Sequence, residues 1–118
     1  MTRPSVPELS EKTIQARVRR LYLDVGADVF STSQMRRSHV ARGLPDLIVL
    51  HPKLGCVFHE VKARKGKQSP AQVAFQQSCE RAGVTYLCGG VDVALEHLKR
   101  IGVLHDIKWL QLATGGVG

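Results

Sequence analysis

Two apolar runs joined by a short link constrain the fold more than any other feature of the chain. Residues 44–50 (LPDLIVL) and 56–62 (CVFHEVK) are rich in β-branched or aromatic residues. The link between them, residues 51–55, contains both proline and glycine. Strand-forming runs on either side of a turn of this length predict an antiparallel β-hairpin.

The expected register of this hairpin brings two acidic residues together. If the turn is centred on Lys53 and no bulge shifts the pairing, Ile48 lies opposite Phe58 and Asp46 lies opposite Glu60. Directly opposed Cβ atoms are about 4.5–5.5 Å apart. Two carboxylates at that distance repel each other unless a proton or a cation lies between them. Lys62 falls on the same face as Glu60, because side chains alternate along a strand.

A helix is expected before the hairpin. Its apolar residues recur at helical spacing on one face: Ile14, Val18, Leu21, Tyr22 and Val25. Ser10 is a suitable N-cap, and Gly26 stops the helix. The three arginines of this segment, Arg17, Arg19 and Arg20, point away from that face and are expected to be solvated.

The segments after this helix complete an α/β pattern. Residues 28–32 predict a short strand, and residues 84–88 another. The capping box Ser69-Pro70-Ala71-Gln72 predicts a helix to about Arg81, and Asp92 is expected to cap a last helix to about Arg100. The buried residues of the middle helix are expected to be Ala71, Phe75, Cys79 and Ala82. The order α-β-β-β-α-β-α indicates a single α/β domain over residues 1–118, with a mixed central sheet flanked by helices. Its core is expected over about 8–101, with 102–118 as a C-terminal tail.

The charge of the chain favours a polyanionic partner. Seventeen Lys and Arg residues oppose ten Asp and Glu residues, which gives a net charge of +7. Nucleic acid fits this balance because each neutralised phosphate releases counterions; an anionic membrane surface is the competing explanation. The sequence shows neither an apolar run long enough to span a bilayer nor a signal peptide. The three cysteines match no disulfide framework or CxxC zinc pattern, and Cys56 and Cys79 are expected to be core residues. A reducing, cytoplasmic location is therefore expected.

Asp46 and Glu60 are the only acidic residues between Asp28 and Glu80. The same stretch holds many basic residues: Arg36, Arg37, Arg42, Lys53, Lys62, Arg64, Lys65 and Lys67. Carboxylates repel phosphate and are disfavoured in strands, so their presence calls for a specific reason. Two carboxylates and the backbone carbonyl of Val61 would supply hard oxygen ligands for Mg²⁺ or Mn²⁺. Such a metal activates water and neutralises charge on a phosphate, while Lys62 orients the water or stabilises the phosphorane.

Three further residues have more than one interpretation. Glu11 falls on the apolar face of the first helix, where it is either solvated at the helix end or directed at the metal. His59 faces away from Glu60 and is expected to be packed or hydrogen-bonded rather than catalytic. His39, in a basic loop, either contacts DNA or is solvated.

Over residues 11–99 the chain resembles the PD-(D/E)xK nuclease superfamily, and within it the VRR-NUC (virus-type replication-repair nuclease) branch. The resemblance rests on Glu11 in EKTIQARVRRLY, GLPDLIV at residues 43–49, EVK at 60–62 and SPAQ at 69–72. It implies a restriction-endonuclease-like core in which Asp46, Glu60 and the Val61 carbonyl bind Mg²⁺ or Mn²⁺ and Lys62 is catalytic. It also implies that Glu11 is linked to the metal and that Gln72 is an active-site residue. Gln72 also belongs to the capping box, so both roles hold only if its amide is shared.

The resemblance is to the compact, stand-alone form found in bacteriophages and bacteria. It implies a homodimer that cuts branched DNA, including four-way (Holliday) junctions, as in DNA repair. The basic loops around the open end of the hairpin are expected to contact DNA, through Arg36, Arg37, Arg42, Arg64, Lys65 and Lys67. The alternatives are a nuclease for flaps, a non-catalytic DNA- or RNA-binding module with a nuclease fold, and a small protein whose basic face binds an acidic partner. The few aromatic residues show no stacking pattern for a single-strand platform.

Overall fold

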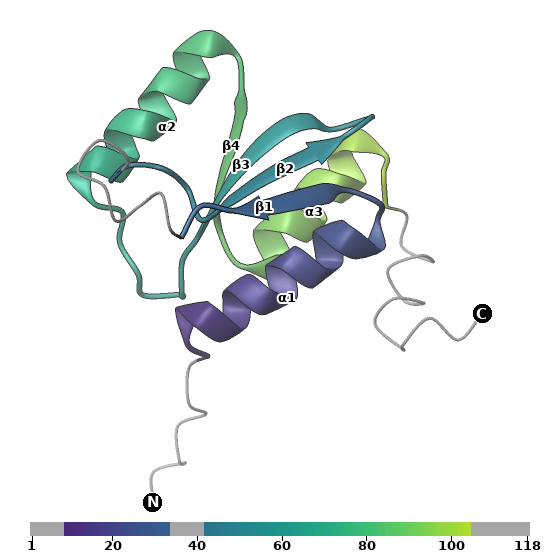
Figure 1. Cartoon of the computed structure of the whole chain (residues 1–118), viewed down its shortest axis with the longest axis horizontal. Helices are drawn as coiled ribbons and strands as arrows, with labels where there is room; N and C mark the ends of the chain where they lie inside the picture. The colour runs from purple at the N-terminus through teal and green to yellow at the C-terminus, as the bar shows by residue number, and fades with distance from the viewer. Residues whose placement is uncertain (1–8, 34–41, 105–118) are drawn as a thin grey trace, which may run out of the picture.

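The computed structural model describes residues 9–33 and 42–104. They form three layers, with a four-stranded sheet between helices on its two faces (Figure 1). The elements are α1 (Glu11–Asp24), β1 (Asp28–Ser31), β2 (Leu47–His51), β3 (Gly55–Val61), α2 (Pro70–Ala82), β4 (Thr85–Gly89) and α3 (Val91–Ile101). The strands are ordered β1-β2-β3-β4, with β1-β2 and β2-β3 antiparallel and β3-β4 parallel. The expected element order and mixed sheet are confirmed.

The hairpin has the expected register. Ile48 pairs with Phe58, and Leu50 pairs with Cys56. The β2 ladder begins at Leu47 rather than at residue 44 as expected. The shorter strand has a local cause, because Pro45 has no N–H to donate to a ladder. Asp46 therefore lies one residue before the ladder, at the position that continues the register toward Glu60.

Two of the three expected helix caps are confirmed. The Ser10 hydroxyl accepts a hydrogen bond from Thr13 N at 3.2 Å, and Ser69 and Gln72 form the capping box of α2. The cap expected for α3 is wrong. Gly90 is the N-cap and forms no side-chain cap, while Asp92 lies within the first turn. A carboxylate in that turn still interacts favourably with the helix dipole.

The hydrophobic core lies between the sheet and the pair α1 and α3, which pack side by side on one face (Figure 1). Its fully buried residues include Val18, Tyr22, Leu47, Val57 and Leu98. The cysteines in the described residues are free thiols; Cys79 is buried as expected, whereas Cys56 is half-buried. None of the helices in residues 9–33 and 42–104 is long and apolar enough to cross a membrane.

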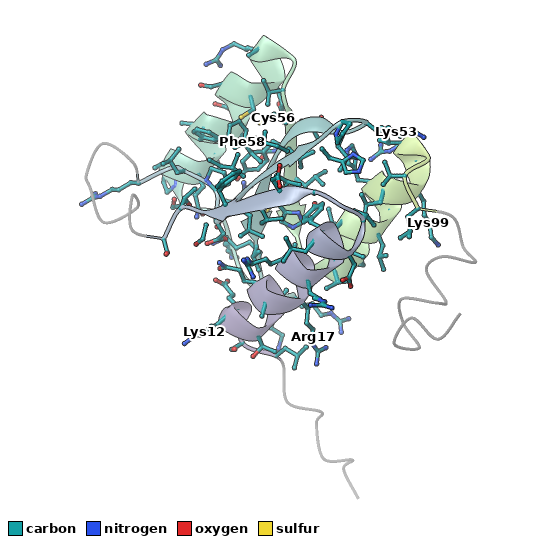
Figure 2. The ribbon with its side chains drawn as sticks, turned by 45° about the vertical axis from the view of Figure 1, so that its right-hand side comes forward. Lys12, Arg17, Lys53, Cys56, Phe58 and Lys99 are labelled. Carbon is teal, nitrogen blue, oxygen red and sulfur yellow. The ribbon has the colours of Figure 1, made fainter. Side chains whose placement is uncertain are left out.

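Helix α2 covers the other face of the sheet alone. Phe58 and Cys56 lie on this side (Figure 2), and Phe58 packs edge-on against Phe75 of α2, with ring centroids 5.2 Å apart. The expected buried face of α2 is partly wrong, because Ala82 is exposed at the end of the helix while Gln72 is buried. A buried glutamine at the start of α2 needs polar partners.

Candidate active site

Asp46 is held at the end of β2 by the neighbouring strand ends. Thr32, buried just after β1, donates its backbone N–H to the Asp46 carbonyl at 3.0 Å and its hydroxyl to the Pro45 carbonyl. The Asp46 carboxylate, through Oδ2, accepts the backbone N–H of Val61 at 2.7 Å. A single aspartate thus connects the end of β2 to Val61, the last residue of β3.

Glu60 is a buried carboxylate, with 1% of its surface exposed. Its Oε2 accepts a hydrogen bond from Gln72 Nε2 at 2.8 Å and lies 3.6 Å from Lys62 Nζ. The Lys62 side chain is itself only 16% exposed. Burying charges is unfavourable unless they are paired and hydrogen-bonded. The site therefore maintains a charge pair at a stability cost, which is characteristic of functional positions.

Gln72 serves both the helix cap and the site. Its Oε1 accepts the Ser69 backbone N–H at 2.8 Å, while its Nε2 donates to Glu60. The orientation of the amide is unambiguous, because a backbone N–H can only donate and a carboxylate accepts. The two expected roles of Gln72 are compatible because each uses a different end of the amide.

Gly43 brings the loop before β2 against the start of α2. A Cβ at this position would lie 2.4 Å from the Ala71 carbonyl oxygen, which no side chain tolerates. This close approach places Arg42 beside the N-terminal end of α2. Together with Lys62, Lys67 and Gln72, Arg42 lines a groove at this end of the sheet.

Glu11 approaches the site from α1 without joining the two other acids. Its Oε1 lies 2.9 Å from the position that a Cβ on Gly66 would occupy, and Lys62 Cδ contacts the same position at 3.3 Å. Glu11 is exposed. In residues 9–33 and 42–104, no three His, Cys, Asp or Glu side chains are grouped closely enough to hold a metal by themselves. A metal link through Glu11 therefore stays a prediction.

The donor set around Asp46 and Glu60 fits a hard divalent cation. Both side chains offer carboxylate oxygens, and β3 ends at Val61, whose carbonyl is a neutral oxygen donor. No sulfur or imidazole group is required, which agrees with Mg²⁺ or Mn²⁺ rather than zinc. The protein residues that would hold such an ion are Asp46, Glu60 and Val61.

His59 lies on the opposite face of β3 from Glu60 and is fully buried in the core. Its Nε2 donates to the Gly89 carbonyl at 3.0 Å, so its Nδ1 is the acceptor for the Tyr22 hydroxyl at 2.7 Å. Burial lowers the pKa of this imidazole below its usual value. His59 is packed and hydrogen-bonded, as expected from its position in the strand.

The expected DNA-contacting residues separate into four groups. Arg42 and Lys67 line the groove beside α2, and Arg64 lines a second groove on the α1 side of Lys62. Lys65 is exposed in the same loop. Arg36, Arg37 and His39 lie outside the described residues, as does most of the C-terminal tail. Two features of the site were not predicted from the sequence. Thr32 donates hydrogen bonds to the carbonyls of Pro45 and Asp46, and Arg17 lines the second groove.

No family model matches this sequence, and no curated protein matches it either. Solved structures do. One, described as "VRR_NUC domain", is 25% identical with a TM-score of 0.61, over 76% of this chain and 94% of that structure. Another, described as "VRR_NUC domain protein", is 19% identical with a TM-score of 0.60, over 86% of this chain and 94% of that structure.

The three-layer fold, with a buried carboxylate and a lysine at one end of its central hairpin, defines an α/β domain of the nuclease class. Within that class, the match over nearly the whole length of a solved domain shows that the chain has the fold of a VRR-NUC domain. Four of the residues that carry the sequence resemblance meet at one place in this fold, namely Asp46, Glu60, Lys62 and Gln72, whereas Glu11 lies beside Gly66.

Proposed function

We propose that this protein is a Mg²⁺- or Mn²⁺-dependent endonuclease that hydrolyses phosphodiester bonds in DNA. The observation that carries the proposal is the environment of Glu60. The Glu60 carboxylate is only 1% exposed, and one of its oxygens lies against both the Lys62 ammonium and the Gln72 amide. The Asp46 carboxylate, which accepts the backbone N–H of Val61, lies next to it. Such an arrangement lowers the stability of the fold, and a role in phosphodiester hydrolysis accounts for its presence.

Each residue has a role that follows from its atoms. Asp46, Glu60 and the Val61 carbonyl would hold the cation, which supplies an activated water and neutralises charge on the phosphate. Gln72 fixes the orientation of Glu60 by donating to Oε2. Lys62, close to the same carboxylate, presents its ammonium to the phosphate and stabilises the negative charge that develops on it.

We further propose that the substrate is branched DNA, with four-way junctions as the leading candidate, and that the protein acts as a cytoplasmic homodimer. The net charge of +7 and the basic grooves on both sides of Lys62 support a polyanion. The junction and the dimer are supported by the resemblance described above. Two copies related by a twofold axis would present two sites to the two symmetric strands of a junction.

The test is cleavage of labelled four-way junction, flap and linear duplex DNA of the same sequence, each with Mg²⁺, Mn²⁺ or EDTA. Glu60→Gln and Lys62→Ala should abolish cleavage while leaving binding in place. Lys53→Ala is the matched control, because it removes the same charge at the far tip of the hairpin (Figure 2). If the wild-type protein binds these substrates but cuts none of them with either metal, the proposal is wrong and a non-catalytic binding module is favoured. Light scattering at micromolar concentration tests the dimer, and a monomer there would contradict it.

A further inference from the structure

Lys62 lies where two grooves meet. One groove, of about 610 Å³, runs toward the N-terminal end of α2 and includes Arg42, Lys67 and Gln72 in its lining. The other, of about 640 Å³, runs between α1 and the junction of β4 with α3. Lys62 lines both. Each groove falls within the volume range of about 300–1,000 Å³ that is typical of small-ligand sites, so each has room for a nucleotide-sized group.

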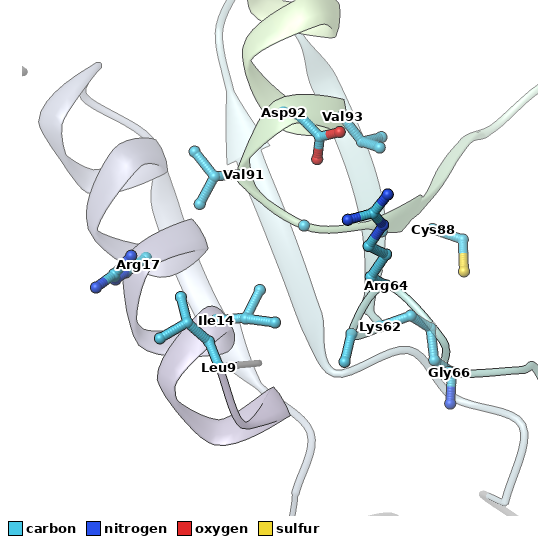
Figure 3. Close-up of a pocket in the computed structure, with 13 residues that line it drawn as sticks. Leu9, Ile14, Arg17, Lys62, Arg64, Gly66, Cys88, Val91, Asp92 and Val93 are labelled. Atoms are coloured by element: carbon cyan, nitrogen blue, oxygen red, sulfur yellow. The ribbon is translucent and has the colours of Figure 1, made fainter. Parts of the chain in front are cut away.

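The second groove, here called the α1–α3 groove, is lined by both basic and apolar side chains. Its lining includes Ile14, Arg17, Lys62, Arg64, Val91 and Asp92 (Figure 3). In Figure 3, Arg64 extends from the loop after β3 toward the first turn of α3, whereas Arg17 lies on α1 with its guanidinium directed away from Arg64, at the outer rim of the groove. Among the described residues of this lining, Asp92 is the one that is acidic.

The two arginines of the α1–α3 groove are available for a ligand. Both are exposed, and within residues 9–33 and 42–104 neither forms an ion pair. Arg20, one turn further along α1, differs in this respect, because its Nε lies 3.0 Å from the Asp24 carboxylate. Arginine is well suited to phosphate because its guanidinium donates several hydrogen bonds and is always charged.

We propose that the α1–α3 groove binds the sugar-phosphate backbone of the cut DNA strand on one side of the scissile phosphate, with Arg17 and Arg64 contacting its phosphates. The proposal rests on the function proposed above. A strand that passes Lys62 must continue in both directions, and the groove beside α2 accommodates one of them. The α1–α3 groove accommodates the other, with Ile14 and Val91 as apolar surface for sugars and the two guanidinium groups for phosphates.

This role was not foreseen for Arg17, because it belongs to a run with Arg19 and Arg20 whose members all lie off the apolar face of the helix. The fold distinguishes them. Arg17 is one turn after Ile14, on the edge of α1 that borders the site, whereas Arg19 is exposed and absent from the groove lining. Arg17→Gln and Arg19→Gln are therefore matched variants that remove the same charge from the same helix.

The experiment measures binding of a labelled four-way junction in EDTA, where a metal-dependent enzyme does not cut, over a series of salt concentrations. Each phosphate contact contributes roughly 0.7–0.9 to the slope of log K against log salt. Arg17→Gln and Arg64→Gln should each reduce the slope by about that amount, and Arg19→Gln should leave it unchanged. Asp92→Asn should act in the opposite direction and strengthen binding, because it removes a charge that repels phosphate.

Equal slopes for Arg17→Gln and Arg19→Gln would overturn the assignment, because the effect would then reflect net charge alone. This outcome is separable from failure of the proposed function. If wild-type protein cuts junctions while the two variants bind alike, the groove assignment fails and the nuclease stands. If Arg17→Gln alone weakens binding but the wild-type protein cuts nothing with Mg²⁺ or Mn²⁺, the groove stands and the proposed function fails.

Discussion

The two faces of β3 bury different chemistry. Toward α1 and α3, Val57 and Val61 belong to the core, and the only polar member, His59, has a partner for each ring nitrogen. Toward α2, Phe58 is followed by Glu60, which is paired with Lys62 and Gln72. One face is closed by two helices, whereas the other is covered by one helix alone (Figure 1). The comparison indicates that the face of β3 toward α1 and α3 mainly contributes to the stability of the fold. The face toward α2 carries the residues on which activity depends.

Removing Lys62 should produce the largest effect on activity. Lys62→Ala is expected to lower the cleavage rate on the order of 10²–10³-fold, because an ammonium aimed at developing charge is lost. The melting temperature should fall as well, because Glu60 then keeps its buried charge without the Lys62 ammonium beside it. Single-turnover cleavage and thermal unfolding of the same sample measure both quantities. A large fall in stability with activity retained would reverse the comparison.

Removing one hydroxyl from the core should lower stability and leave the cleavage rate unchanged. Tyr22→Phe leaves the buried Nδ1 of His59 without its donor, which is expected to cost about 1–3 kcal/mol of the free energy of unfolding. Cleavage at a temperature where both proteins are folded should be unaltered. Tyr86→Phe is the control on the α2 face, where the hydroxyl is half-buried and accepts from Gln68 at 3.2 Å. Urea unfolding of both variants tests the comparison, and equal losses would contradict it.

Gln72 contributes both to stability, through the cap of α2, and to the site, through its hydrogen bond to Glu60. Two variants at this position separate these roles. Gln72→Ala should cost about 1 kcal/mol through the lost capping hydrogen bond and should also reduce cleavage. Gln72→Glu restores an acceptor for Ser69 but places a carboxylate against Glu60. We expect cleavage to stay low and the free energy of unfolding to remain below that of the wild type, because two buried carboxylates then repel each other. If cleavage recovers together with stability, Gln72 acts only as a cap.

The smallest effect is the dependence of stability on pH. Burial lowers the pKa values of His59 and His97 from the ordinary value of 6.5. Below about pH 6.5 the unfolded chain binds protons that the folded protein does not, so their contribution is complete above that pH and is lost as the pH falls. Each histidine adds at most about 1.4 kcal/mol per pH unit. Urea unfolding in EDTA between about pH 7.5 and 5.5 measures the slope, and His97→Gln should reduce it. An unchanged slope would show that His97 takes up its proton in the folded state as well.

Much of the fold and the central part of the site could be predicted from local patterns. The hairpin register followed from the turn and the strand alternation, and these two signals alone were enough to place Asp46 next to Glu60. The capping box identified Gln72 and the start of α2. Each of these signals depends on residues close together in the chain, where backbone geometry fixes spacing.

Other parts of the site depend on contacts between distant segments. Thr32 holds Pro45 and Asp46, and the only local signal is a threonine at a strand end. Gly43 needs to be glycine because the Ala71 carbonyl approaches it. Glu11 reaches Gly66 and the Lys62 stem, but among the described residues it forms no metal-holding group with Asp46 and Glu60.

The sequence by itself determined that Asp46, Glu60 and Lys62 share one end of a hairpin, because strand alternation and a short turn leave little freedom there. Only the tertiary structure decided that the Gln72 amide reaches Glu60 and that Arg17, alone among three neighbouring arginines, borders the site. The physical reason is the range of the interactions. Periodicity and capping act over a few residues, whereas the position of α1 and α2 relative to the sheet is set by packing of the whole core.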